Sequence, residues 1–84
     1  MKPVRVYTTR ICGYCVAAKR LLDRKGIAFE EIDVSEDPAT RHWLVTTTGQ
    51  RTVPQIFIGD EPIGGFTELR GLDMSGELDR RLAR

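Results

Sequence analysis

The feature that most constrains this chain is a Cys-x-x-Cys pair, Cys12 and Cys15, which are its only two cysteines. Residues 4–7, before the pair, alternate in polarity and are rich in valine, which favours a strand. Residues 16–25, after the pair, carry apolar side chains at helical spacing. A Cys-x-x-Cys at a strand-to-helix junction is typical of a thiol–disulfide redox site.

Length and charge exclude several classes of protein. The chain has 84 residues and a formal net charge of +1, so we expect one domain, 1–84, with a modest core. The near-neutral charge predicts no nucleic-acid partner, and the lack of a long apolar run predicts no membrane span. An N-terminus without a signal-like apolar segment predicts a cytoplasmic protein, in a compartment where thiols stay reduced or cycle.

The remaining chain predicts an α/β fold in the order βαβαββα. The first two strands should run parallel through a right-handed crossover, and the last two should form an antiparallel hairpin. The result is a mixed four-stranded sheet with helices on both faces. After the first strand and helix, the expected elements are a strand over 27–34, a helix over 38–48, strands over 55–58 and 62–64, and a helix over 66–84 interrupted near 73–76.

The position of Cys12 at the helix start predicts a reactive thiolate. Backbone N–H groups without helical partners and the helix dipole should both stabilise the anion. Such sites bring a thiol pKa to roughly 3.5–7.5, and Arg10 could add positive charge. Cys15, nearly one turn into the helix, should be more buried and keep a higher pKa. We therefore expect Cys12 to attack and Cys15 to resolve.

Two other roles for the cysteines are less favoured. Structural zinc usually needs four ligands, and the only further candidate is His42, which we interpret as a solvated residue. A purely structural disulfide would close too short a loop to add much stability. Elsewhere, Trp43 is interpreted as core or half-buried filler, and Arg80, Arg81 and Arg84 as a solvated helix face.

Further motifs stand in a characteristic order along the chain. Tyr7-Thr8 precedes the cysteine pair, Thr52-Val53-Pro54 leads into residues 55–59, and Ile63-Gly64-Gly65 follows. With these motifs the chain resembles the small bacterial dithiol glutaredoxins over essentially its whole length. The resemblance implies a thioredoxin-like fold and a glutathione-dependent thiol–disulfide oxidoreductase that reduces protein–glutathione mixed disulfides and protein disulfides. Client proteins such as ribonucleotide reductase are usual for the family.

The resemblance also implies a glutathione site. Pro54 is expected to be cis and to present the Val53 backbone to the cysteinyl part of glutathione. The start of the last helix would bind the γ-glutamyl carboxylate, and Arg41 or Arg51 would face the glycyl carboxylate. The implied contacts are Tyr14, Arg41, Arg51, Thr52, Val53, Pro54, Gly65, Phe66, Thr67 and Glu68.

Three positions depart from the usual family pattern. Thr9 stands where lysine is frequent, so Arg10 is a possible substitute for the missing charge. Glu68 replaces the usual aspartate, which contacts the γ-glutamyl ammonium, although it could equally cap the helix. Gly13 stands at the position where the commonest dithiol motif has proline. Glycine there restores a backbone N–H and loosens the loop, so the redox potential and the thiol pKa should shift.

Two alternatives stay open beside glutathione-dependent reduction, and Gly13 bears on the first of them. Relatives without the proline include members that hold a [2Fe–2S] cluster between two subunits, with Cys12 of each subunit and a bound glutathione as ligands. We otherwise expect a monomer. The other alternative is an electron donor served by thioredoxin reductase in place of glutathione.

Overall fold

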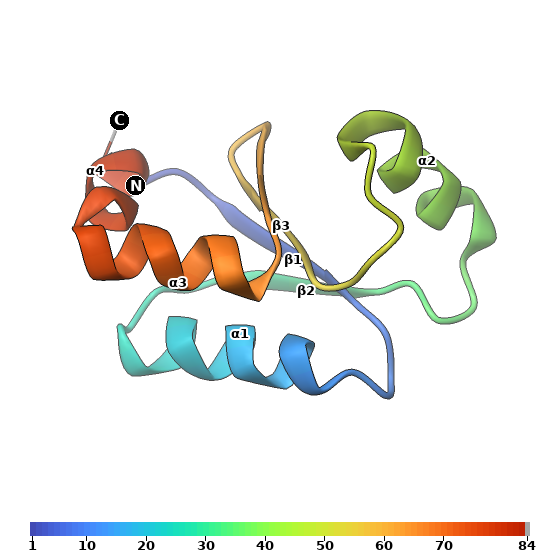
Figure 1. Ribbon diagram of the computed structural model, residues 1–84, viewed down its shortest axis with the longest axis horizontal. Helices are drawn as coiled ribbons and strands as arrows, with labels where there is room; N and C mark the ends of the chain where they lie inside the picture. Colours follow the sequence, from blue (N-terminus) through green and yellow to red (C-terminus); the bar gives the residue numbers. More distant parts are fainter. Residues whose placement is uncertain (84) are drawn as a thin grey trace.

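The computed structural model describes residues 1–83 and contains a mixed four-stranded sheet in the order β2-β1-β3-β4. The first two strands pair in parallel, whereas the third is antiparallel to both the first and the fourth. The predicted order and pairing are therefore confirmed (Figure 1). The elements are β1 (Val4–Thr8), α1 (Gly13–Arg24), β2 (Glu30–Asp33), α2 (Pro38–Thr48), β3 (Gln55–Ile58), β4 (Glu61–Gly64), α3 (Phe66–Ser75) and α4 (Glu77–Ala83).

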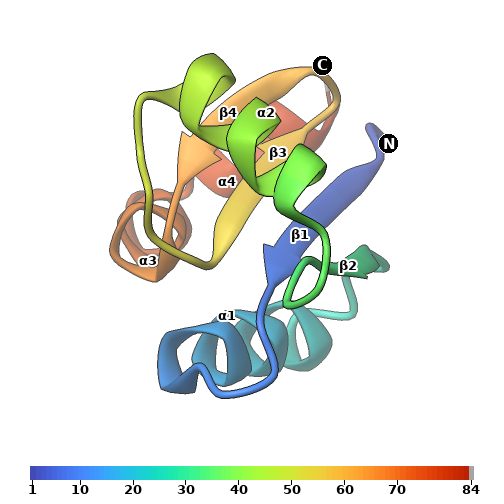
Figure 2. The same cartoon turned by 90° about the vertical axis from the view of Figure 1, so that its right-hand side faces the viewer.

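Helices cover both faces of the sheet because the side chains of its central strands alternate. Val6 and Ile56 point to one face and join the apolar residues of α1, α3 and α4. Tyr7 and Phe57 point to the other face and pack with Leu44 of α2. Figures 1 and 2 show the same division, with α1 and α3 together and α2 apart from them.

Helix α1 holds the cysteine pair against the sheet. It buries Cys15 and Leu22 on one side, and it ends where Gly26 adopts a positive φ of 68°. The N-terminal residue of the helix follows Cys12 directly. The first cysteine is therefore fixed at the point where the chain, having left β1, enters the helix (Figure 2).

One predicted element differs from the structure, and another has the interruption that was expected. The second strand is shorter than predicted because the Ile27 N–H donates to Leu22 O (2.9 Å) in the turn that follows α1. The predicted last helix is two helices, separated by Gly76 at φ +80°, so the expected interruption is confirmed. Arg84 lies outside the described residues.

Three outward-facing residues can be compared with their predicted roles. His42 is exposed, as predicted. Trp43 was expected to be core or half-buried, but it is exposed at 41%, and its ring stacks on Phe57 at 5.6 Å between centroids. The prediction for Arg81 is wrong, because its side chain is largely covered and forms an ion pair with Glu61 (3.2 Å). Among the described residues, no helix has the length and apolarity that crossing a membrane requires.

Candidate functional site

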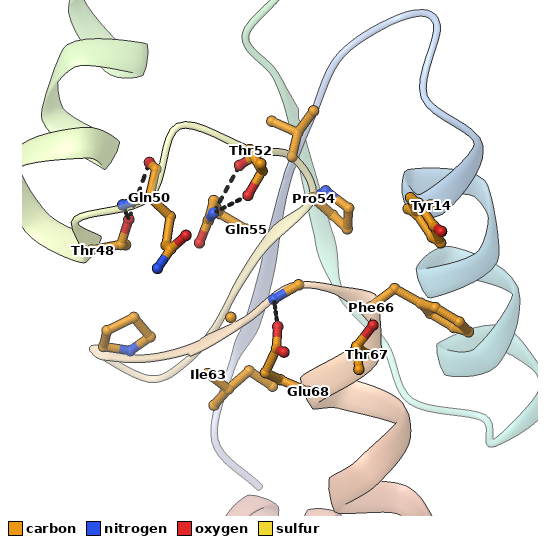
Figure 3. Close-up of a pocket in the computed structure, with 14 residues that line it drawn as sticks. Tyr14, Thr48, Gln50, Thr52, Pro54, Gln55, Ile63, Phe66, Thr67 and Glu68 are labelled. Atoms are coloured by element: carbon orange, nitrogen blue, oxygen red, sulfur yellow. Dashed lines mark hydrogen bonds between the residues drawn. The ribbon is translucent and has the colours of Figure 1, made fainter.

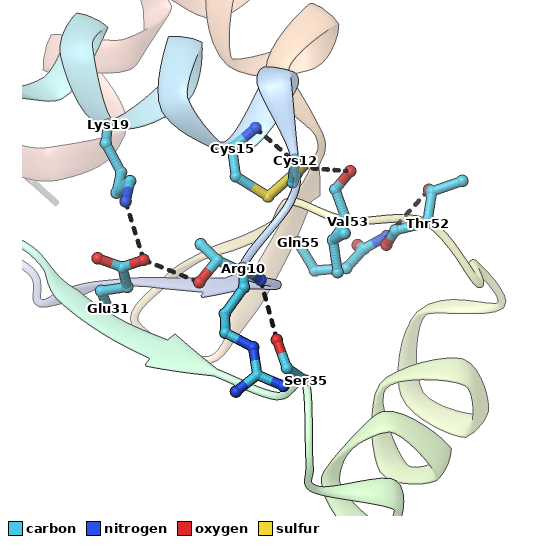
Figure 4. Close-up of a disulfide and its surroundings, with 10 residues drawn as sticks. Arg10, Cys12, Cys15, Lys19, Glu31, Ser35, Thr52, Val53 and Gln55 are labelled. Atoms are coloured by element: carbon cyan, nitrogen blue, oxygen red, sulfur yellow. Dashed lines mark hydrogen bonds and ion pairs between the residues drawn. A yellow bond between two sulfur atoms is a disulfide. The ribbon is translucent and has the colours of Figure 1, made fainter.

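The two cysteines form a disulfide at the start of α1 (Figure 4). Cys12 is the N-cap residue of the helix, and its Sγ accepts a hydrogen bond from the Cys15 N–H (3.0 Å). Cys15 is buried at 1% exposure, whereas Cys12 is only partly buried. The predicted positions are confirmed, and in the disulfide Cys12 is the more accessible cysteine.

Val53 lies beside the sulfur of Cys12. The Val53–Pro54 peptide bond is cis, as expected, and the Val53 carbonyl oxygen is 3.7 Å from Cys12 Sγ. A disulfide sulfur carries no proton, so this distance describes a contact and not a hydrogen bond. The backbone of Val53 is therefore placed where it can meet a molecule that reacts at Cys12.

A groove of about 630 Å³, which we call the main groove, is lined by Tyr14 of α1 (Figure 3) and by Val53, which contacts Cys12. At one end the rings of Tyr14 and Phe66 are stacked, with centroids 6.3 Å apart. From there the groove passes Pro54 and the first turn of α3 and reaches Thr48 and Gln50. Eight of the ten predicted glutathione residues line it: Tyr14, Thr52, Val53, Pro54, Gly65, Phe66, Thr67 and Glu68.

Glu68 caps the start of α3. One of its carboxylate oxygens accepts a hydrogen bond from the Gly65 N–H (2.7 Å). The side chain also packs so closely on Gly64 that a Cβ there would lie 2.7 Å from the carboxylate. Gly64 in addition has φ +104°, a conformation that L side chains rarely adopt. The helix-capping role considered for Glu68 is confirmed, and it leaves the second oxygen of the carboxylate without an assigned role.

Arg41 and Arg51 do not line the main groove. They line a second cavity of about 520 Å³, which we call the side pocket, together with His42 of α2. Thr52 and Val53 line both cavities. The side pocket therefore continues from the backbone beside Cys12, and its two arginines are exposed.

Arg10 does not turn its charge toward Cys12. Its guanidinium forms an ion pair with Glu36 (3.4 Å), and its backbone N–H donates to Ser35 Oγ (2.9 Å). Figure 4 shows the side chain directed away from the disulfide. The suggestion that Arg10 replaces the lysine missing at Thr9 is therefore not supported by its placement.

A charged pair near the cysteines was not anticipated. Lys19, one helical turn after Cys15, contacts Glu31 of β2 (3.0 Å), and the Thr8 hydroxyl donates to the same carboxylate (2.9 Å). The hydrogen bond from Lys19 is the main cause that lowers the pKa of Glu31, against an opposing effect of partial burial. Helical spacing alone could have placed Lys19 on the face of Cys15, but Glu31 is brought there by strand pairing.

The main groove also includes residues that were not predicted to contact a ligand. Thr48, Gln50, Gln55, Pro62, Ile63 and Gly64 complete its lining. Gln55 had a recognisable signal in the sequence, because it is a polar residue at the start of an apolar strand, and the structure buries it at 2% exposure. The others come from segments that only the fold brings together.

Comparisons with known proteins agree with this geometry. Residues 4–63 match the family model for glutaredoxin. The chain is 46% identical over 83 residues to a glutaredoxin of Pseudomonas aeruginosa, covering 99% of both proteins. It is 43% identical over 79 residues to glutaredoxin 3 of Escherichia coli, covering 94% of this chain and 95% of that protein.

Solved structures show the same likeness in three dimensions. A crystal structure of a buckwheat glutaredoxin–glutathione complex has a TM-score of 0.91 and 34% identity, over 98% of this chain and 77% of that one. The solution structure of a Brucella melitensis glutaredoxin has a TM-score of 0.87 and 42% identity, over 100% of this chain and 94% of that one. With its paired cysteines at the start of a helix, the chain belongs to the glutaredoxin family of thiol–disulfide oxidoreductases.

Proposed function

We propose that the protein is a glutathione-dependent reductase of protein–glutathione mixed disulfides and of protein disulfides. The observation that carries the proposal is the continuity of Cys12 with two cavities. The Cys12 sulfur contacts Val53, and Val53 lines both the main groove and the side pocket. An extended tripeptide whose sulfur lies at Cys12 would then have one cavity for each of its ends.

Each part of glutathione has a chemically suitable partner. The N–H and C=O of Val53 suit the cysteinyl residue, which would pair with them as a short added strand. The start of α3, at Thr67 and Glu68, suits the γ-glutamyl end through its free backbone N–H groups. Arg41 and Arg51 of the side pocket suit the glycyl carboxylate, because guanidinium groups bind carboxylates through charge-assisted hydrogen bonds.

The reaction follows from the accessibility of Cys12. Its thiolate, which is stabilised by the Cys15 N–H and the helix start, attacks the glutathione sulfur of a mixed disulfide. The old S–S bond breaks, and the client leaves as a thiolate that takes a proton from water. A second glutathione thiolate then attacks the glutathione sulfur bound to Cys12, which releases glutathione disulfide and restores the Cys12 thiolate.

Cys15 offers a second route from the same adduct. When its thiolate attacks the Cys12 sulfur, glutathione leaves as a thiolate and the Cys12–Cys15 disulfide forms. For protein disulfides, Cys12 first forms a mixed disulfide with the client, and Cys15 resolves it in the same way. Two glutathione molecules then reduce the internal disulfide.

The test is a glutathione-coupled assay with a glutathionylated protein as substrate. We expect Cys12→Ser to abolish turnover and Cys15→Ser to retain it, because the glutathione route needs only the first cysteine. Turnover in Cys12→Ser would contradict the mechanism. If thioredoxin reductase without glutathione supports the same turnover of the wild type as glutathione does, the result would favour the alternative in which thioredoxin reductase reduces this protein.

A cluster-bound dimer remains a second candidate. An ideal Cβ at Gly13 would have no heavy atom within 4 Å, so the surface at the helix start is open beside Cys12. In such a dimer, Cys12 of each subunit and one glutathione per subunit would be the ligands. A colourless, monomeric protein after anaerobic reconstitution with iron, sulfide and glutathione would contradict this candidate.

A further inference from the structure

Gln55 is one of only two buried polar residues found in the described part of the chain, together with Thr8. It is the first residue of β3, pairs with Tyr7 of β1, and is 2% exposed. Burial of a carboxamide is unfavourable unless its polar atoms find partners. The contacts of this side chain should therefore indicate what it does.

One end of the carboxamide holds the chain beside Cys12. The Gln55 Nε2 group donates to the Thr52 carbonyl oxygen (2.7 Å) and lies 3.5 Å from the Thr52 hydroxyl (Figure 3). A carbonyl oxygen can only accept, so the nitrogen end must face Thr52. Thr52 precedes Val53, whose carbonyl oxygen contacts the Cys12 sulfur at 3.7 Å.

The other end of the carboxamide has no partner. Gln55 Oε1 is buried and accepts no hydrogen bond from the described residues. An unsatisfied buried oxygen costs about 1–3 kcal/mol, and an apolar side chain of the same shape would avoid that cost. Packing alone therefore explains glutamine poorly at this position, whereas the hydrogen bond that its Nε2 group donates to Thr52 explains it.

We propose that Gln55 is a positioning residue that holds the Thr52–Val53 backbone in the geometry that receives glutathione. The inference rests on the proposed function, because it assigns Val53 to the cysteinyl part of glutathione. The Thr52–Val53 segment that Gln55 restrains follows two exposed residues, Gln50 and Arg51, and begins with an exposed one. Loss of the restraint should weaken glutathione binding and leave the thiol chemistry of Cys12 nearly unchanged.

The first test is Gln55→Met, which keeps the shape of the side chain and removes its hydrogen bonds. We expect the Kd of the unreactive ligand S-methylglutathione, measured by calorimetry, to rise about 3–10-fold, the effect of one hydrogen bond. The KM for the glutathionylated substrate should rise similarly, with kcat changed less than about twofold. Reaction of Cys12 with a small aromatic disulfide that needs no groove should stay at the wild-type rate.

Phe57→Leu is the matched control, because Phe57 lies on the same strand and the same face and is buried at 1% exposure. It should lower thermal stability and leave the Kd of S-methylglutathione within about twofold of wild type. An unchanged Kd in Gln55→Met, with wild-type protein binding normally, would overturn the positioning role alone. Wild-type protein that fails to bind S-methylglutathione would instead overturn the proposed function.

Gln55→Glu gives a second readout that a packing role would not produce. In its neutral form the carboxylic acid can donate its O–H to the Thr52 carbonyl, whereas the ionised form can only repel that oxygen. Burial should raise the pKa of the introduced acid. The Kd of S-methylglutathione for this variant should therefore increase with pH relative to the wild type, and a parallel pH profile would overturn the proposal.

Discussion

At the scale of single residues, the two cysteines differ in what the fold lets them do. Cys12 caps α1 and is partly exposed, whereas Cys15, three residues later, is buried at 1% exposure. Less than one helical turn therefore separates a partly exposed sulfur from a buried one. This difference in access supports the proposed order, in which Cys12 attacks first.

The arginines of the side pocket allow a prediction on binding. Arg41→Gln and Arg51→Gln should each raise the KM for glutathione about 3–10-fold, because each removes a charged donor from a carboxylate in a solvent-exposed pocket. Steady-state kinetics with glutathione as the varied substrate would measure the change. Arg70→Gln is the control, because Arg70 is an exposed residue of α3 outside both cavities. An effect as large as that of the other two variants would contradict the assignment.

At the scale of elements, short local signals decide where α3 ends and α4 begins. Gly76 has φ +80° and its N–H donates to Asp73 O (3.1 Å). The resulting bend lets α4 bury Leu78 and Leu82. The end of α4 also reaches the start of the chain, where the Lys2 N–H donates to Leu82 O (2.9 Å).

Two glycine substitutions of opposite effect test this account of the bend. Gly76→Ala should lower the free energy of unfolding by more than about 1 kcal/mol, since alanine is strained at positive φ. Gly71→Ala, inside α3 with no heavy atom within 4 Å of an added Cβ, should raise it by about 0.5–1 kcal/mol. Urea unfolding would measure both, and a stabilising Gly76→Ala would show that the bend does not depend on glycine.

At the scale of the whole molecule, we expect stability to depend on pH through acidic groups on and after β2. A hydrogen bond from Lys19 lowers the pKa of Glu31, and hydrogen bonds from Ser35 and Thr40 lower the pKa of Asp33 and Asp37 respectively. A carboxyl group whose pKa is lower in the folded state stabilises the fold above its unfolded pKa. That contribution is lost as the pH falls through the folded value.

The free energy of unfolding should therefore decrease as the pH falls from about 5 to about 3. Glu31→Gln should make this decrease smaller, because glutamine has no carboxyl group to protonate. Urea unfolding at a series of pH values would measure the slope for both proteins. A decrease as steep in the variant as in the wild type would show that Glu31 makes no contribution.

Sequence patterns predicted the elements whose limits are set by local chemistry. Helix α2 begins after Asp37, with Pro38 in its first turn, and ends at Gly49, as its capping residues indicate. Arg10 shows the limit of that reasoning, because closeness in sequence to Cys12 does not fix where a long side chain points. Pairing of Lys19 with Glu31 likewise required knowledge of strand register.

The candidate site likewise has parts that the sequence predicts and parts that depend on the fold. Its backbone parts, Cys12 at the helix start and Val53 before a cis proline, could be predicted from motifs. The separation of Arg41 and Arg51 into a side pocket could not, because it depends on how α2 packs on the sheet. The role inferred for Gln55 came from its hydrogen bond to Thr52 and from its unpaired oxygen, both of which only the fold reveals.

The most direct test of the central claim is the identity of the adduct that Cys12 forms. Cys15→Ser protein would be mixed with one equivalent of a glutathionylated protein, quenched with acid and analysed by intact-protein mass spectrometry. The account predicts one glutathione bound to Cys12 and the client released with a free thiol. A client protein bound to Cys12, or Cys12 left unmodified, would contradict it.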